Sequence, residues 1–212
     1  MTASYLNWSV EELFTKASAA APEPGGGAVS AMSGCLGCGM LTMVAQISVN
    51  KAKDPDTARE INLLMAGLAE ISETLKALAQ KDMQAFNQFM EVLALPNKTP
   101  EEKKLREDKK QQAALLSAEV PLTIGRNCLA ALGWASKIAV LGSKLAISDV
   151  AVGVYLLEAS LKGALIMVDA NVPYLKDKAK VAELLKEKER LILEAEELAR
   201  DTLQRVKSRM QE

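Results

Sequence analysis

The fold is decided by residues 22–49, which have the sequence PEPGGGAVSAMSGCLGCGMLTMVAQISV. After Glu23 this stretch carries no charge, and its apolar part from Ala28 onward is about long enough to span a bilayer. Serine, glutamine and glycine residues interrupt it, so we predict a helix buried inside a protein instead. Its small residues recur at helical spacing, which lets neighbouring helix backbones approach closely. We expect this helix to be central.

The turn before this helix is the first candidate binding element. Pro22 and Pro24 end the preceding helix, and Gly25, Gly26 and Gly27 allow backbone conformations that are closed to other residues. The turn ends at a helix N-terminus, where unpaired amides and the helix dipole favour an anion or a carbonyl oxygen. On glycine content alone, a ligand-binding loop and a plain tight turn explain the sequence equally well.

Helical patterns continue on both sides of this stretch. Ser9 and Glu12 form a capping box for a short first helix. Apolar residues spaced at the helical period predict a long helix over 57–93. Thr99, followed by a proline and two glutamates, starts another long helix. Pro121 should kink or end that helix, because proline lacks an amide donor and clashes with the preceding turn.

Two further helices complete the predicted fold. Ser148 or Asp149 can cap a helix that ends near Asn171, and an amphipathic pattern from about Lys178 predicts a surface helix. No segment alternates with the period of two that is typical of strands. The sequence therefore predicts an all-α protein, one domain over residues 1–212, folded as an antiparallel bundle of long helices.

Composition limits the possible classes of function. The 212 residues include 26 basic and 27 acidic side chains, so we expect neither nucleic acid nor a membrane as a partner. The N-terminus lacks the features of a signal peptide, which predicts a cytoplasmic protein. Three cysteines without any histidine cannot complete a four-ligand zinc site. The absence of histidine also leaves carboxylates, lysines and tyrosines for acid–base chemistry.

Asp82 is the second candidate. It lies within a predicted helix, with Phe86 and Phe89 one and two turns further on. A carboxylate beside an apolar surface can have its pKa raised by desolvation, which suits acid–base catalysis. An ordinary solvated carboxylate on a helix is the commoner explanation of such a residue.

Several motifs occur in an order that resembles one family. They are Pro24-Gly25-Gly26-Gly27, Asp82-x-x-Ala85-Phe86, Leu95-Pro96-x-x-Thr99-Pro100-Glu101-Glu102-Lys103, Gln111, Val120-Pro121-Leu122, Ser148-Asp149 and Asn171. In this order they resemble the formiminotetrahydrofolate cyclodeaminase and methenyltetrahydrofolate cyclohydrolase family. The resemblance spans nearly the whole chain, and its most specific parts are the Asp-x-x-Ala-Phe element and the run that ends at Lys103.

The resemblance implies an all-helical homodimer that acts on the one-carbon unit between N5 and N10 of a tetrahydrofolate substrate, without a metal. It implies that Asp82 is the catalytic residue. The substrate-binding residues that it implies are Pro24, Gly25, Gly26, Gly27, Lys51, Lys53, Ser148, Asp149 and Asn171. Considered singly, those at predicted helix ends are explained equally well by surface charge and capping.

The resemblance leaves the activity open. Because no formiminotransferase domain is fused here, the leading expectation is a methenyltetrahydrofolate cyclohydrolase, which hydrolyses 5,10-methenyltetrahydrofolate to 10-formyltetrahydrofolate. The alternative is a formiminotetrahydrofolate cyclodeaminase, in which ring closure releases ammonia. A non-enzymatic alternative is a folate- or anion-binding helical dimer with eroded catalysis. It rests on three departures from the family pattern, at Asp54, Ser143 and Met167.

Overall fold

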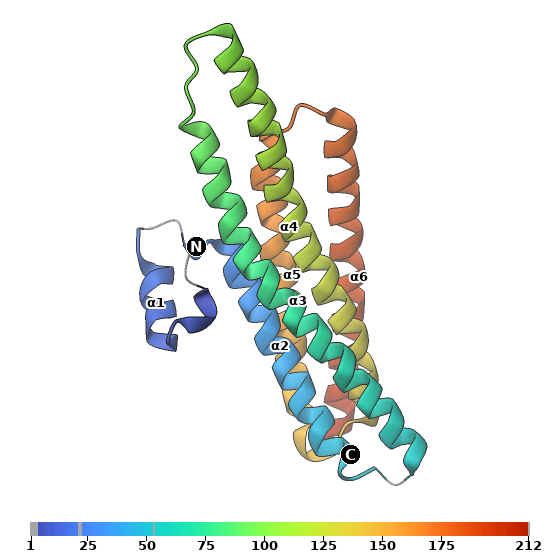
Figure 1. Cartoon of the computed structure of the whole chain (residues 1–212). Coiled ribbons are helices and arrows are strands. Elements are labelled where there is room, and N and C mark those ends of the chain that lie inside the picture. The colour runs from blue at the N-terminus through green and yellow to red at the C-terminus, as the bar shows by residue number, and fades with distance from the viewer. Residues whose placement is uncertain (1–3, 21–22, 53, 212) are drawn as a thin grey trace.

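The computed structural model describes residues 4–20, 23–52 and 54–211, so Pro22 and Lys53 lie outside the described residues. Within these ranges it contains helices and no strand, which confirms the all-α prediction (Figure 1). The short helices are η1 Tyr5–Asn7, α1 Val10–Ser18, η2 Lys144–Ala146 and η3 Val172–Tyr174. The long ones are α2 Gly26–Val49, α3 Pro55–Leu93, α4 Pro100–Leu141, α5 Ile147–Asn171 and α6 Lys178–Gln211, and successive long helices run antiparallel.

Local sequence signals set the helix starts. Capping boxes form at Ser9 for α1 and at Thr99 for α4, as predicted. Asp54 caps α3, since its carboxylate accepts hydrogen bonds from the amide and the hydroxyl of Thr57, both at 2.8 Å. One of the three departures from the family pattern therefore has a structural role.

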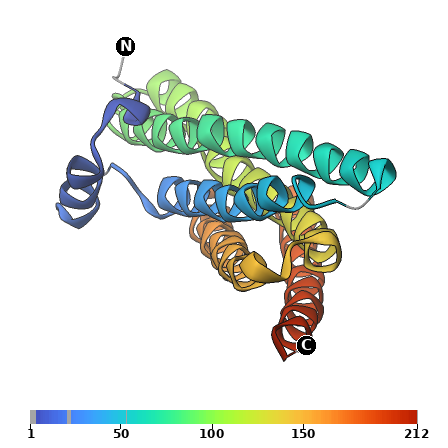
Figure 2. The ribbon, with the colours of Figure 1, turned by 90° about the horizontal axis from the view of Figure 1, so that it is seen from below.

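The central helix is α2, which packs against α3, α4 and α5. A Cβ on Gly37 would lie 3.1 Å from the carbonyl oxygen of Gly153 on α5, and the reverse distance is also 3.1 Å, so the two backbones are close. Seen from below, α2 and α5 lie side by side (Figure 2). By length and composition α2 and the segment Lys144–Tyr174 could each cross a membrane, and half of the apolar window of α2 is buried in this bundle.

Two predictions about helix boundaries are wrong. Of the two outcomes expected at Pro121, a kink or an end of the helix, the end is wrong, because α4 continues to Leu141. Its ring is buried, and the packing around it offsets the cost of about 3 kcal/mol for proline within a helix. Ser148 and Asp149 lie inside the first turn of α5 and do not cap it. The chain passes directly from η2 into α5, so Ala146 takes the capping position without a side-chain hydrogen bond.

Candidate active site

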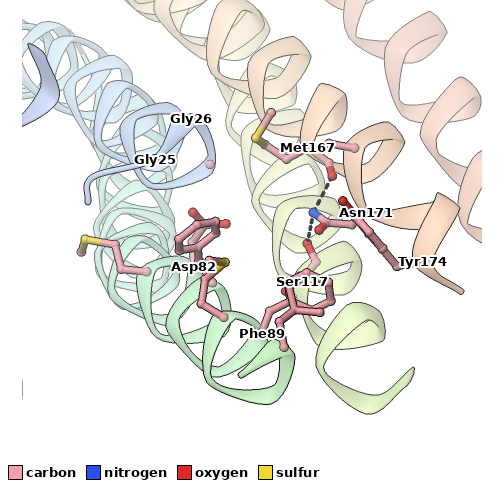
Figure 3. Close-up of a pocket in the computed structure, with 14 residues that line it drawn as sticks. Gly25, Gly26, Asp82, Phe89, Ser117, Met167, Asn171 and Tyr174 are labelled. Carbon is pink, nitrogen blue, oxygen red and sulfur yellow. Dashed lines mark hydrogen bonds between the residues drawn. The ribbon is translucent and has the colours of Figure 1, made fainter. Parts of the chain in front are cut away.

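A cavity of about 370 Å³ lies between the start of α2, the second half of α3, the middle of α4 and the end of α5 (Figure 3). It brings together the glycine turn, Asp82 and Asn171, which are far apart in the sequence. The remaining lining is mostly apolar: Met83, Phe86, Phe89, Met90, Leu93, Ser117, Met167, Ala170 and Tyr174. A cavity of this size and character suits a small organic ligand with a few polar groups.

Asp82 lies against the first turn of α2. Burial raises the pKa of its carboxyl group to about 6. The backbone amide of Ala28 favours the carboxylate and acts in the opposite direction, but desolvation is the larger effect. Such a group is partly ionised near neutral pH, so it can both accept a proton and return it.

Gly27 makes room for this carboxylate. A Cβ on Gly27 would lie 2.6 Å from Cγ of Asp82 and 2.7 Å from its Oδ2, which is closer than real Cβ contacts come. The turn does not use the conformational freedom that glycine allows, because no described glycine has a positive φ. Glycine is needed at position 27 because a side chain there would collide with the Asp82 carboxyl group. Asn87 on α3 donates a hydrogen bond to the carboxylate of Glu23, which ties the turn to the helix that carries Asp82.

Pro121 fixes the orientation of Asn171. Because proline has no amide hydrogen, the carbonyl of Ser117, four residues earlier, has no partner within α4. Asn171 Nδ2 donates to that carbonyl at 2.9 Å and to the carbonyl of Met167 at 2.7 Å (Figure 3). Both hydrogens of the side-chain nitrogen are used in this way, so Oδ1 is the polar atom left for a ligand.

The apolar walls of the cavity come largely from one face of α3. Asp82, Phe86, Phe89 and Leu93 follow one another at intervals of three or four residues, and the ring of Phe89 lies 5.0 Å from that of Tyr174. Sequence reasoning found the two phenylalanines but missed Met90, Leu93, Ser117 and Tyr174. The helical spacing after Asp82 was a signal for Met90 and Leu93, whereas nothing in the local sequence points to Tyr174.

A second, basic pocket borders the cavity. It measures about 220 Å³ and shares Leu93 with the cavity, and its charged lining residues are Lys103, Arg106, Glu107 and Lys110. The Lys110 ammonium lies 5.5 Å from the centre of the Tyr174 ring, which lines the cavity. Arg106 also donates a hydrogen bond to the carbonyl of Leu93. Lys103, Arg106 and Lys110 thus place cations beside the cavity.

The other predicted binding residues do not line the cavity. Lys51 follows the last turn of α2, whereas Ser148 and Asp149 lie in the first turn of α5. Since α2 has 24 residues, the glycine turn and Lys51 are separated by roughly 36 Å. Pro24 is buried beside the cavity without lining it, and Lys53 is outside the described residues. The structure therefore separates the predicted binding residues into two groups, at opposite ends of α2.

The three departures from the family pattern also lie at opposite ends of α2. Asp54 and Ser143 lie at the end of the bundle away from the cavity, where the Ser143 amide donates to Ser48 Oγ at 2.7 Å. Met167 alone lines the cavity, and its sulfur would lie 3.3 Å from a Cβ on Gly26.

The fold and the cavity together define a class of protein, a helical bundle with a half-buried carboxyl group of raised pKa in an apolar cavity of ligand size. The pattern of a family described as formiminotransferase-cyclodeaminase matches residues 9–190. The methenyltetrahydrofolate cyclohydrolase of Methylorubrum extorquens is 32% identical over 96% of this chain and 98% of its own length. The chain therefore belongs to the formiminotransferase-cyclodeaminase family.

Two further relatives represent the other activity in the family. The formimidoyltransferase-cyclodeaminase of Gallus gallus is 30% identical over 82% of this chain, which corresponds to 32% of that longer protein. The crystal structure of a formiminotetrahydrofolate cyclodeaminase from Thermotoga maritima matches 97% of both chains with a TM-score of 0.85 and 26% identity. The names of the Methylorubrum and Thermotoga proteins refer to tetrahydrofolate, and the likeness to these relatives confirms the family and the fold predicted from the sequence.

Proposed function

We propose that this protein hydrolyses 5,10-methenyltetrahydrofolate to 10-formyltetrahydrofolate. The observation that carries the proposal is Asp82, a carboxyl group with a pKa of about 6, held in an apolar cavity against the start of α2. The likeness to the Methylorubrum cyclohydrolase over nearly the full length of both chains supports this choice of activity.

Asp82 acts as a proton shuttle in this proposal. Its carboxylate takes a proton from water as the oxygen adds to the electrophilic carbon between N5 and N10. The resulting tetrahedral carbon carries a hydroxyl group and both nitrogens. Asp82 returns its proton to N5 as the bond between carbon and N5 breaks, and the hydroxyl proton leaves to solvent as the formyl carbonyl forms. The amides at the start of α2 favour the carboxylate form that begins the cycle.

The surroundings of Asp82 suit the rest of a folate molecule. The walls formed by Phe86, Phe89 and Tyr174 can contact flat aromatic rings. The cations Lys103 and Lys110 lie beside the cavity, where they can pair with the carboxylates of a glutamate tail. Opposite charge at the rim of a site favours encounter and orientation more than it adds raw affinity.

The second candidate is ring closure of 5-formiminotetrahydrofolate with loss of ammonia. The fold match to the Thermotoga cyclodeaminase favours it. The same carboxyl group would serve, because both reactions pass through a tetrahedral carbon bonded to the two nitrogens. The non-enzymatic alternative is weakened at Asp54, because its carboxylate caps α3 and this departure therefore has a structural role.

One experiment separates these activities. Purified protein is incubated with 5,10-methenyltetrahydrofolate and the loss of its near-ultraviolet absorbance is followed. A parallel reaction with 5-formiminotetrahydrofolate is assayed for released ammonia. We expect hydrolysis to be the faster reaction. Faster release of ammonia would favour the cyclodeaminase, and inactivity on both substrates with folate still bound would refute the enzyme proposal.

We further propose that two copies of the chain associate through the outward faces of α2 and α5. The helix α2 has no charged residue. Exposed apolar side chains on the two helices include Val29, Leu36, Val152, Tyr155 and Ile166, of which Leu36 is 65% exposed. In a two-fold dimer with antiparallel α2 helices, the end that carries Lys51 and Asp149 in one protomer would approach the cavity of the other. This arrangement would reunite the two groups of predicted binding residues.

Mixing two inactive variants tests this arrangement. Asp82→Asn and Asp149→Asn are each expected to lose most activity, and their co-refolded mixture should recover about a quarter of the wild-type rate. The reason is that half of the dimers are mixed and each mixed dimer has one intact site. Turnover of the mixture is the measurement.

A control for the mixing experiment adds Leu36→Glu to both variants. This change places a charge on the proposed contact face, so sedimentation should show monomers and mixing should restore nothing. Full activity of Asp149→Asn alone, or no recovery in a confirmed mixed dimer, would contradict the shared site.

A further inference from the structure

Ser117 has an unused hydroxyl group on the wall of the cavity. The residue is 9% exposed, and its Oγ has no hydrogen-bond partner among the described residues. The other buried serines differ, since Ser30, Ser48 and Ser160 each donate to a backbone carbonyl. An unpartnered buried hydroxyl lowers folding stability, so its retention in a ligand-sized cavity points to a partner that comes with the ligand.

Asn171 supplies a second polar atom at the same place. Its Nδ2 donates to the carbonyl of Ser117 itself, so the two residues are adjacent (Figure 3). No described residue donates to its Oδ1, and the two hydrogen bonds of Nδ2 hold that oxygen in a fixed orientation. Ser117, whose hydroxyl can donate, is thus hydrogen-bonded through its backbone to a residue whose acceptor oxygen is held in one orientation.

We propose that Ser117 and Asn171 together bind the lactam edge of the substrate's pterin ring. The Ser117 hydroxyl donates to the ring carbonyl, and Asn171 Oδ1 accepts from the neighbouring ring N–H. The proposal rests on the proposed folate activity. It agrees with the position of Asp82 in the same cavity, because the lactam carbonyl of a pterin is next to the ring carbon that bears the reacting N5. Ser117 is therefore a residue that determines specificity and does not exchange protons with the substrate.

The test compares Ser117→Ala with Ser160→Ala. Dissociation constants for 5-formyltetrahydrofolate are measured by calorimetry, and thermal unfolding is measured without ligand. Ser117→Ala should weaken binding roughly tenfold while its melting temperature stays level or rises, because no hydrogen bond within the protein is lost. Ser160→Ala removes a hydroxyl that donates to the Ser30 carbonyl, so its melting temperature should fall and its affinity should not change.

A second ligand identifies the group that Ser117 contacts. In the 4-amino analogue of the same folate, an amine replaces the lactam oxygen. Ser117→Ala should weaken binding of this analogue much less than binding of the lactam ligand. Equal losses for both ligands, or a lower melting temperature with unchanged affinity, would overturn the assignment of Ser117. Failure of the wild-type protein to bind either folate would instead overturn the proposed function.

Discussion

Replacing Gly27 with alanine is expected to lower kcat at least about a hundredfold, since displacement of a catalytic group by about 1 Å can cost that much. The new Cβ would lie 2.6 Å from Cγ of Asp82, so the carboxyl group must move away from the first turn of α2. The carboxyl group would lose its interaction with the Ala28 amide and would no longer lie beside the reacting carbon. The bundle should remain folded, because the Asp82 side chain can rotate toward the cavity. Steady-state kinetics and circular dichroism measure the two effects.

Two controls isolate the cause of this loss. Gly133 also lies within a helix, but a Cβ there would meet nothing within 4 Å. Gly133→Ala should therefore keep full activity and gain about 0.5–1 kcal/mol in stability. If Gly27 acts through Asp82, Gly27→Ala should add little to the defect of an Asp82→Asn protein. Fully additive losses in the double variant would show that the glycine acts by another route.

Asp82→Asn is expected to lower turnover by roughly 10²–10⁴-fold, the usual contribution of a general acid–base group. The amide is nearly the same size as the carboxyl group, so folate binding should survive. In the wild-type protein kcat/KM should rise with pH and level off above about 6, because the reaction begins with the charged form of Asp82. Initial rates measured across pH give this profile. Undiminished activity of Asp82→Asn would show that this residue has no part in the mechanism.

The same substitution should change how stability depends on pH. The pKa of Asp82 is raised in the folded protein from 3.8 to about 6, so the folded state holds the proton more tightly than the unfolded state. Stability is therefore lost as pH rises from about 4 to 6. Above pH 7, Asp82→Asn should be more stable than the wild type by roughly 3 kcal/mol, and the difference should vanish near pH 3.

Much of the fold could be predicted because local signals and long-range packing agree. Ser9 and Thr99 cap helices whose apolar residues follow the helical period, and small residues on α2 meet α5 at Gly37. Pro121 shows where local reasoning fails. Its cost to an isolated helix is real, but in a buried helix the surrounding contacts decide whether the helix continues.

The candidate site was predictable only in part. The chemistry of the residues identified Asp82 and the glycine turn as candidates, and the resemblance linked them. The reason for Gly27 could not be predicted, because neither segment alone shows that α2 and α3 approach each other closely. Ser117 was missed because its hydroxyl and its free carbonyl gain meaning only when α5 brings Asn171 beside them. A sequence signal did exist. The carbonyl four residues before any helical proline lacks its usual donor, so position 117 was open to a partner from elsewhere.

The proline in α4 also has a consequence for how this site could diversify. Asn171 is held by the backbone carbonyls of Ser117 and Met167, and every amino acid has such a carbonyl. Side chains at 117 and 167 can therefore be exchanged in evolution without releasing the asparagine that they flank. As long as the proline is kept, Asn171 keeps its position, while the side chains around it can change to bind a different substrate.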